Sequence, residues 1–318
     1  MAEADPKNKN KSTAPFRAGY VATIGRPNLG KSTLLNQILG EKVAIVSPKP
    51  QTTRNRITGI RTTPAAQIIF LDTPGIHQGH SLMNRRMVDT ALQTLDEVDG
   101  VVWLLDAHDK IKQEEERIAE TLRGVDTPVL ILLNKIDLVS KGKLLPLMER
   151  CAQLLPDKEI VPVSALHGDG VEIILDMVER WLPEGTPFFT EGEYTDQSER
   201  FLASEIVREK VFLLTREEIP YGVAVTIDEF TEKQEKNLIV IAATIHTERD
   251  SHKGILIGKR GAMLKETGKQ AREELERLLN ASRGTFRIKN YPVAANWRHT
   301  YWWREDDVDY AEAQFFTQ

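Results

Sequence analysis

The segment Gly25–Ser32 reads GRPNLGKS and fits the pattern G-x-x-x-x-G-K-[ST]. Residues 20–24 before it, YVATI, indicate a buried strand, and the sequence STLLNQILG after it indicates a helix that ends at Gly40. Between a strand and a helix N-terminus, backbone N–H groups and the helix dipole attract phosphate. We expect Lys31 to reach the terminal phosphates and Ser32 to bind Mg²⁺. The segment therefore predicts a site for a di- or triphosphate.

Two polar motifs downstream contain groups suited to Mg²⁺ and the last phosphate. The sequence DTPG begins at Asp72, directly after the apolar run 68–71, so its carboxylate can hold Mg²⁺ through water and the Gly75 amide can touch the last phosphate. The sequence QTTRN at Gln51–Asn55 lies between the phosphate loop and DTPG. We expect Thr53 to contact Mg²⁺ there, although a solvated loop explains those five residues equally well when they are taken alone.

Recognition of the base is predicted from two motifs that follow apolar strands. In PVLILLNKIDL, Asp137 can accept hydrogen bonds from the ring and exocyclic N–H groups of guanine, an arrangement that adenine does not offer. Asn134 can donate to the guanine keto oxygen, and the stem of Lys135 can cover the base. In VPVSALHGDG, Ser164 and Ala165 follow another short strand, and the Ala165 amide can donate to the same keto oxygen. The ordered set of motifs predicts a guanine-nucleotide site for GTP or GDP.

These segments resemble the five motifs of GTPases related to translation factors, over roughly the first half of the chain. The residues expected to contact nucleotide are Gly25, Arg26, Pro27, Asn28, Leu29, Gly30, Lys31, Ser32, Thr33, Asp72, Thr73, Pro74, Gly75, Asn134, Lys135, Asp137, Ser164 and Ala165. Those expected to act in hydrolysis are Lys31, Thr53, Asp72 and Gly75, and those expected to hold Mg²⁺ are Ser32, Thr53 and Asp72.

The residue after DTPG is Ile76, at the position where Ras-like enzymes carry a glutamine that orients the attacking water. Isoleucine cannot hydrogen-bond to water, so we expect slow intrinsic hydrolysis. A partner or ion that supplies the missing charge can be worth roughly 10³ to 10⁵ in rate. Asn28 resembles the position that coordinates K⁺ in related GTPases; an amide that only stabilises the loop is the alternative interpretation.

Composition indicates a two-domain protein of the cytoplasm. The chain has 318 residues, of which 41% are hydrophobic, enough for two ordinary cores. The single cysteine, Cys151, cannot form an internal disulfide, and we expect it to pack in a helix. Neither a signal peptide nor an apolar run of membrane-spanning length is apparent.

The pattern along the chain divides it into five parts. Residues 1–15 are a polar tail that we expect to be disordered. Apolar runs alternate with helical stretches over 16–183, which predicts an α/β domain with a mostly parallel sheet and helices on both faces. Residues 184–197 are rich in Pro and Gly and are expected to be a linker. An α+β domain is predicted over 198–304, followed by a tail, 305–318.

The second domain has a basic turn. Gly258–Gly261 reads GKRG and precedes a helix with apolar residues at spacings of three and four. A G-x-x-G turn between two helices is how a KH domain clamps about four single-stranded nucleotides, although any solvated turn could contain these residues. Residues 250–304 carry 12 Lys or Arg against 5 Asp or Glu, whereas the whole chain has a net charge of −5. The residues expected to contact RNA are Lys253, Gly258, Lys259, Arg260, Gly261 and Lys265.

Taken over residues 16–298, the chain resembles the Era family of GTPases. The resemblance includes all five motifs and, more specifically, QSERFLASEIVREKVFLLTREEIPYGVAV. It implies a type II KH domain, nucleotide-gated binding to the 3′ end of small-subunit ribosomal RNA, assistance in assembly of the small ribosomal subunit, and peripheral association with the inner membrane. The longer, aromatic C-terminal sequence departs from the family, so Trp297, Trp302 and Trp303 are interpreted as packing residues, with base stacking as the alternative.

Two functions from different classes remain open. The first is a GTPase switch, expected to be monomeric, whose nucleotide state controls RNA binding. The second is an RNA-binding assembly factor in which GTP is mainly structural and turnover is incidental. Lys31 and Asp72 favour the first, whereas Ile76 keeps the second open. A membrane-bound signalling GTPase is disfavoured because the sequence contains no basic amphipathic anchor.

Overall fold

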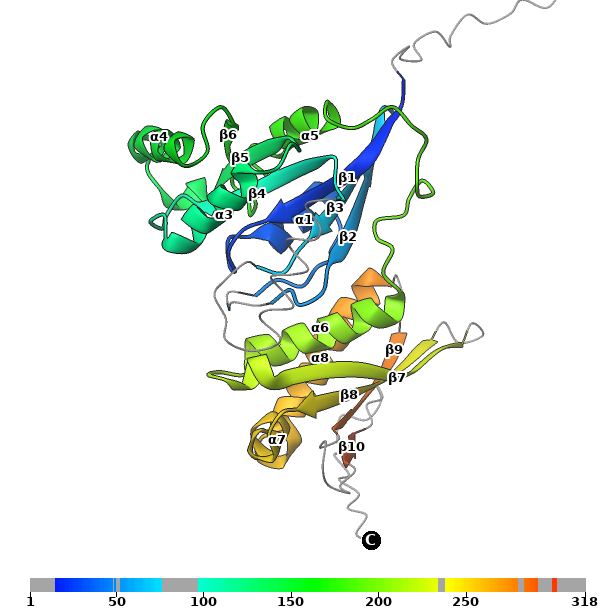
Figure 1. Ribbon diagram of the computed structural model, residues 1–318. Helices are drawn as coiled ribbons and strands as arrows, with labels where there is room; N and C mark the ends of the chain where they lie inside the picture. The colour runs from blue at the N-terminus through cyan, green and yellow to red at the C-terminus, as the bar shows by residue number, and fades with distance from the viewer. Residues whose placement is uncertain are drawn as a thin grey trace, which may run out of the picture. The chain divides into compact units, whose positions relative to one another are not determined.

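The computed structural model of the chain describes residues 15–47, 49, 52–75, 97–233, 238–279, 283–290 and 299–301. Its contacts divide the chain into two compact units (Figure 1). The first unit comprises Met1–Glu41 and Thr53–Asp196, and the second comprises Lys42–Thr52 and Gln197–Gln318. Ile76 and the three C-terminal tryptophans singled out above lie outside the described residues.

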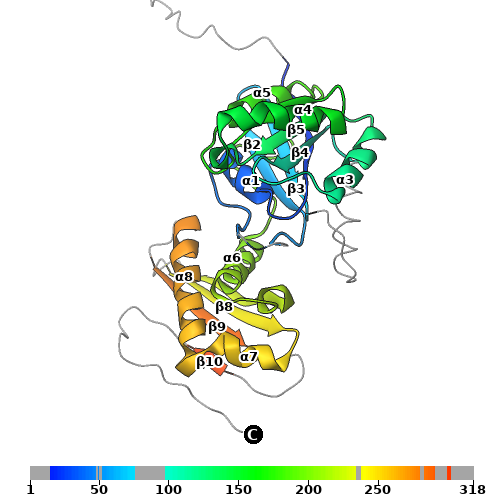
Figure 2. The same ribbon diagram turned by 90° about the vertical axis from the view of Figure 1, so that its left-hand side faces the viewer.

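The first unit is built on a six-stranded sheet with strand order β2-β3-β1-β4-β5-β6. Its elements are β1 (Arg17–Ile24), α1 (Lys31–Leu39), β2 (Ile57–Thr62), β3 (Ala66–Asp72), β4 (Gly100–Asp106), α3 (Gln113–Arg123), β5 (Val129–Asn134), η1 (Ile136–Leu138), η2 (Lys141–Lys143), α4 (Leu144–Leu154), β6 (Glu159–Pro162) and α5 (Val171–Glu179). Among the described strands of this sheet, β2 and β3 form the antiparallel pair and the other neighbours are parallel. Helices α1 and α3 lie on opposite sides of the sheet (Figure 2). The predicted mostly parallel sheet with helices on both faces is confirmed.

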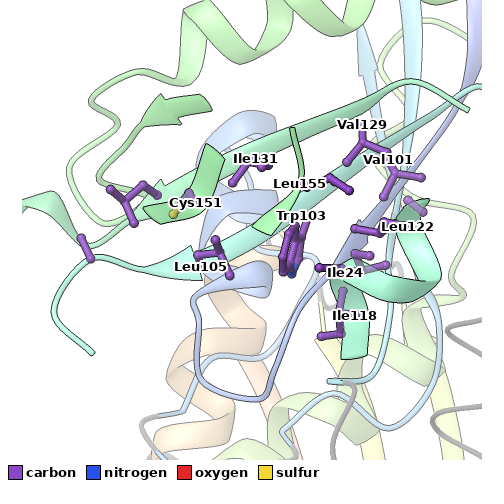
Figure 3. Packing of buried hydrophobic residues seen from close by; sticks show 14 residues of the cluster. Ile24, Val101, Trp103, Leu105, Ile118, Leu122, Val129, Ile131, Cys151 and Leu155 are labelled. Atoms are coloured by element: carbon purple, nitrogen blue, oxygen red, sulfur yellow. The ribbon is translucent and has the colours of Figure 1, made fainter. Parts of the chain in front are cut away.

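The core on one face of this sheet explains the alternating apolar residues of its strands. Alternate side chains of β4 and β5, such as Trp103 and Ile131, pack against α3 and α4 (Figure 3). Cys151 of α4 is buried in the same cluster, and burial raises the pKa of its thiol to about 11. A thiol that stays protonated at neutral pH suits the predicted packing role.

The parallel strands bring their carboxyl ends to one edge of the sheet. The GRPNLGKS loop follows β1, DTPG begins in the last residue of β3, NKID begins in the last residue of β5, and the VSA motif follows β6. In sheets of this kind the loops at the carboxyl ends form the ligand site. The order of the strands therefore gathers motifs that are far apart in the sequence.

The stretch predicted as a linker, residues 184–197, packs along strands β2 and β3 of the first unit. The buried side chain of Gln67 accepts from the backbone N–H groups of Phe188 and Phe189, at 2.7 and 2.9 Å, and donates to the Phe189 carbonyl. At the edge strand β2, Ile60 donates its N–H to the Tyr194 carbonyl at 2.8 Å. The Ile60 N–H, which an uncovered edge strand would leave without a partner in the protein, is thereby satisfied. The contacts place the boundary between units at Asp196, near the end of the predicted linker.

The second unit is α+β, as predicted. Its elements are α6 (Glu199–Leu214), η3 (Ile219–Gly222), β7 (Val223–Lys233), β8 (Leu238–Thr247), α7 (Asp250–Ile257), η5 (Lys259–Gly261), α8 (Ala262–Leu278), β9 (Arg283–Asn290) and β10 (His299–Tyr301). The sheet has the order β10-β9-β8-β7, with β8 and β9 parallel. Apolar residues of α6, α7 and α8 form one core with those of β7 and β8. The apolar stretch before GKRG proves to be the last turn of α7.

The connection between α1 and β2 belongs mainly to the second unit, which the sequence pattern does not indicate. Lys42 Nζ contacts both carboxylate oxygens of Glu209 on α6, at 2.9 and 2.7 Å, and Val46 donates its N–H to the same carboxylate at 2.9 Å. Arg208 donates to the Thr52 carbonyl at 2.6 Å. Glu209 is only 2% exposed, so its charge depends on these partners and on the neighbouring Lys210.

Candidate functional site

The GRPNLGKS loop has a backbone that ordinary residues adopt with difficulty. Gly25, Asn28 and Gly30 have φ values of 147°, 64° and 92°. A Cβ added at Gly25 would lie 2.8 Å from the Leu104 carbonyl oxygen, and one added at Gly30 would lie 2.6 Å from the amide nitrogen of Asn134. Only glycine fits at these two positions, so the loop can curl tightly before α1.

Lys31 is enclosed by the loop that it terminates. It is 6% exposed, and its Nζ donates to the carbonyls of Gly25 and Arg26 at 3.2 and 3.1 Å. Burial lowers the pKa of Lys31 to about 8, against the opposing effect of the Asp72 charge. The ammonium thus lies within the loop that is predicted to cradle a phosphate.

Ser32, Thr53 and Asp72 come together from three separate motifs. The Ser32 hydroxyl donates to Asp72 Oδ2 at 2.6 Å and lies 2.9 Å from the Thr53 hydroxyl, which is 3.4 Å from Asp72 Oδ2. Asp72 is fully buried, and burial raises its pKa in spite of Lys31 and the two hydroxyls. Its Oδ1 has no hydrogen-bond partner among the described residues.

This donor set fits Mg²⁺. Two hydroxyls and one carboxylate are hard oxygen ligands, and Mg²⁺ commonly takes one or two such protein ligands and completes its shell with water and phosphate oxygens. In the part of the chain that the structure describes, no cluster of three or more His, Cys, Asp or Glu side chains offers an alternative metal site. A metal ion would also give the orphaned Oδ1 of Asp72 a partner.

The DTPG segment lies against the phosphate loop. The Thr73 hydroxyl donates to the Thr23 carbonyl of β1 at 2.8 Å, which fixes the turn after β3. A Cβ added at Gly75 would lie 2.6 Å from the backbone nitrogen of Pro27. Gly75 therefore lets the backbone after Pro74 approach the loop closely, where its amide can reach a terminal phosphate.

The two base motifs are joined through one amide side chain. Asn134 donates from Nδ2 to the Leu29 carbonyl at 2.7 Å and accepts from the Ala165 N–H at 2.9 Å. Ser164 donates its hydroxyl to Asp137 at 2.6 Å. The N–H of Ala165 thus donates to Asn134 in the structure. The sequence does not indicate this contact, because the N–H was expected to donate to the guanine keto oxygen. The second N–H of Asn134 Nδ2 is not used by the Leu29 carbonyl, and Oδ2 of Asp137 is not used by Ser164.

One functional candidate was not predicted from the sequence. Asp106, the last residue of β4, pairs with Lys135 at 2.6 Å, and Lys135 is held with φ at 67°. The Ala107 N–H also donates to the Asn134 carbonyl, at 2.8 Å. Asp106 therefore orients the side chain that is expected to cover the base. The signal was an acidic residue at the carboxyl end of a buried parallel strand.

The side chain of Arg26 is engaged away from the expected ligand contacts. It pairs through Nε with Glu115 of α3 and through an outer nitrogen with Asp109, at 3.3 Å. Its place in the motif had put Arg26 among the predicted nucleotide contacts. In the structure its guanidinium is bound by two carboxylates through Nε and one outer nitrogen, which directs the side chain toward Glu115 and Asp109.

The basic turn of the second unit is a tight connection between two helices. Gly258, Arg260 and Gly261 have φ values of 71°, 52° and 77°, and η5 joins α7 to α8 there. Lys259 and Arg260 are exposed, as is Lys265, whereas Lys253 is half-buried. The exposed cations are placed where a passing phosphate backbone could meet them. Among the described residues, no helix combines the length and apolar character that crossing a bilayer requires.

Nucleotide affinity should fall as pH rises above about 8. Phosphates favour the charged form of Lys31, so binding must take up a proton once the pKa of about 8 in the free protein is exceeded. The dissociation constant of GDP should rise by up to about tenfold per pH unit there. Calorimetry in buffers of different ionisation enthalpy should find little proton uptake at pH 7 and clear uptake at pH 9. Equal uptake at both values would contradict the role given to Lys31.

Comparisons with known proteins agree with both units. A family model described as "50S ribosome-binding GTPase" matches residues 20–135, and one described as "KH domain" matches residues 218–298. GTPase Era of Geobacter metallireducens is 53% identical over 269 residues, 85% of this chain and 90% of the relative. GTPase Era of Syntrophus aciditrophicus is 50% identical over 273 residues, 86% of this chain and 89% of the relative.

Two solved structures match at a TM-score of 0.82 and 42% identity, each over 87% of this chain and 95% of the other. One is Era in complex with MgGDPNP and nucleotides 1506–1542 of 16S ribosomal RNA. The other is a variant of Aquifex aeolicus Era bound to GDP and AlF4⁻. With curated relatives above 50% identity over most of its length, both predicted domains in place and the nucleotide motifs assembled at one sheet edge, the chain belongs to the Era family of GTPases.

Proposed function

We propose that this GTPase is a switch that binds the 3′ end of small-subunit ribosomal RNA and assists assembly of the small ribosomal subunit. The observation that carries the nucleotide part is the meeting of Lys31, Ser32 and Thr53 at Asp72. Oδ2 of Asp72 accepts from both hydroxyls, and its buried Oδ1 lacks a partner among the described residues. The RNA part is supported by the exposed Lys259 and Arg260 of the GKRG turn and by the relative solved with nucleotides 1506–1542 of 16S ribosomal RNA.

The residues of the first unit divide the work on GTP. Lys31 leaves the loop carbonyls and pairs with the terminal phosphates, whose charge is then matched by the ammonium and the backbone N–H groups of the loop. Ser32, Thr53 and Asp72 would hold Mg²⁺, which neutralises charge on the phosphates. Thr53, through Mg²⁺, and the Gly75 amide make contacts that depend on the presence of the last phosphate. Cleavage of that phosphate releases these contacts and resets the switch.

Base selection falls to the two motifs at the other end of the site. Asp137 accepts from the ring and exocyclic N–H groups of guanine, while Ser164 donates to Oδ1 of the same carboxylate. Lys135, oriented by Asp106, covers the base. Asn134 uses its remaining donor for the keto oxygen, and the Ala165 amide divides its hydrogen bond between that oxygen and Asn134.

RNA is clamped by the turn between α7 and α8. Gly258 and Gly261 let the phosphate backbone approach closely, and Lys259 and Arg260 supply positive charge at the point of approach. Lys253 and Lys265 flank the turn as further phosphate contacts. We also propose action in the cytoplasm as a monomer, with peripheral association at the inner membrane.

A second candidate is an RNA-binding assembly factor for which GTP is mainly structural. One feature favours it: Ile76 follows DTPG and cannot orient water. The two candidates differ in whether RNA or a cation accelerates turnover. If GTP is only structural, turnover stays slow under every condition.

Turnover of GTP should rise in K⁺ relative to Na⁺ and should respond to a short RNA matching the 3′ end of small-subunit ribosomal RNA. K⁺ near Asn28 would supply the charge that Ile76 does not, with an upper bound of roughly 10³ to 10⁵ in rate. Asn28→Ala should remove the K⁺ effect. Ile76→Ala should lower turnover only modestly and leave nucleotide affinity nearly unchanged, unlike Lys31→Ala.

Turnover is measured in Na⁺ and in K⁺, each with and without the RNA, and these four conditions separate the possible sources of the missing charge. Turnover that ignores the cation, or that Asn28→Ala leaves unaltered, would remove the role of K⁺ and leave RNA or a protein as the source. Turnover that ignores both the cation and the RNA would favour the assembly factor with structural GTP.

A further inference from the structure

Glu115 is a buried carboxylate in the first turn of α3. It is 1% exposed, although glutamate at the start of a helix is normally solvated. Burying a carboxylate is costly unless it is paired and hydrogen-bonded. The contacts of Glu115 should therefore show why its charge is retained inside the unit.

Both oxygens of Glu115 are used. Oε2 accepts from the backbone N–H of Lys112 at 2.7 Å, which closes the N-terminus of α3. Oε1 accepts from Nε of Arg26 in the phosphate loop. Helix capping needs only the first contact, and an exposed carboxylate could make it. The second contact joins α3 to the loop that follows β1.

Arg26 is held from a second side as well. Its outer nitrogen lies 3.3 Å from Asp109, which in turn pairs with Lys112 at 2.6 Å. These neighbours, Lys112 first, lower the pKa of Asp109 to about 2. The Arg26 side chain is only 13% exposed. It is therefore fixed in place by carboxylates, and no donor on its Nε remains for a ligand.

The position of the Arg26 backbone matters to the nucleotide site. Its carbonyl accepts from Lys31 Nζ at 3.1 Å, and the next residue, Pro27, supports the backbone of Gly75. The loop also contains Asn28 in the left-handed region, a conformation that costs energy unless the surroundings hold it. A restraint on Arg26 thus acts on both Lys31 and Gly75.

We propose that Glu115 is a positioning residue of the nucleotide site, which acts through Arg26 to hold the phosphate loop in its binding conformation, and that Arg26 is not itself a phosphate ligand. The inference deepens the proposed nucleotide site and rests on it. GDP and GTP share the phosphates that the loop cradles, so loosening the loop weakens both to the same extent. Turnover at saturation changes little, because the phosphates of a bound nucleotide hold Lys31 and the loop in the binding conformation once the site is filled.

The test uses the full-length protein and three variants. Glu115→Gln keeps the size of the side chain and an oxygen that can cap α3, but removes the charge that binds Arg26. Arg26→Gln removes the other partner, and the third variant combines both changes. Glu116→Gln is the matched control, since it removes an exposed charge from the adjacent position of the same helical turn.

Dissociation constants for GDP and GTP, the saturated rate and the melting temperature are measured for each variant. Each single change should weaken both nucleotides by about tenfold, the lower end of what losing an outer-shell partner costs at metal sites. The double variant should be no weaker than the worse single variant, because the two residues act as one unit. Glu116→Gln should match the wild type.

Three results would overturn the proposal. A lower melting temperature with unchanged affinities would make the pair purely structural. A larger loss for GTP than for GDP in Arg26→Gln, with a fall in the saturated rate, would make Arg26 a phosphate ligand. If the losses of nucleotide affinity in the two single variants multiply in the double variant, Glu115 and Arg26 act independently and not as one unit. Lys31→Ala, measured alongside, tests the site itself: if it abolishes binding, an unaffected Glu115→Gln counts against the positioning role alone.

Discussion

Asp137→Asn should exchange the base preference of the site, so that the variant binds xanthosine triphosphate better than GTP. The wild-type carboxylate accepts from two guanine N–H groups, whereas the new amide donates to the second keto oxygen of xanthine. Ser164 can still donate to the amide oxygen at position 137, as it does to the carboxylate at 2.6 Å, which directs the amide nitrogen to the base. A site built on such bonds can discriminate by roughly 10⁴ to 10⁵.

Competition binding of GTP, ATP and xanthosine triphosphate to both proteins measures the exchange. Asp176→Asn on α5 is a suitable control, because it makes the same chemical change at an exposed position. The control should bind all three nucleotides as the wild type does. Equal affinity of the wild type for GTP and ATP would refute the assignment of Asp137 to the base.

Replacing both Lys259 and Arg260 by Asp should abolish RNA binding by the second unit. The change places two negative charges where the phosphate backbone of a clamped strand passes closest. Arg260 has φ at 52°, a conformation that Asp tolerates better than most residues, and the core residues Leu264 and Leu275 are untouched. The unit should therefore fold, and GTP hydrolysis without RNA should persist because the phosphate loop lies in the other unit.

RNA affinity across a range of salt concentrations is the decisive measurement. Neutralising Lys253 or Lys265, or the exposed Lys269 further along α8, should weaken binding about equally for all sequences. Each single change should flatten the salt dependence by roughly 0.7 units of slope. Lys141→Asp with Lys143→Asp is a matched control, since it reverses two exposed charges in η2 of the first unit. Undiminished binding by the variant at GKRG would place the clamp elsewhere in the chain.

Local signals predicted much of the fold and of the site. A phosphate loop needs glycines, a lysine and a hydroxyl at fixed spacings, so Gly25, Gly30, Lys31 and Ser32 could be read directly, and the helix after them begins at Lys31, within one residue of the expected start. The sheet was equally readable, because buried parallel strands are continuous apolar runs such as β5. Each of these features depends on neighbouring residues in the sequence.

Contacts between distant residues could not be predicted in this way. Nothing near Arg26 in the sequence identifies Glu115 as its partner, and nothing near Lys135 identifies Asp106. A single sequence shows which side chains are charged but not which charges meet after folding. Arg26 was consequently assigned to the nucleotide on its position in the motif alone.

The tie between residues 42–52 and α6 limits how the protein can be divided into fragments. A fragment that begins at Gln197 would keep Glu209 but lose Lys42 and the Val46 N–H, so that buried carboxylate would depend on Lys210 for its charge pairing. A fragment that ends before Gln197 would keep Val43, Ala44 and Ile45, which are buried in the intact chain, and lose the unit to which they belong. The chain therefore cannot be exchanged between relatives by a single cut at residue 197. A chimera should exchange residues 42–52 together with the segment that begins at Gln197.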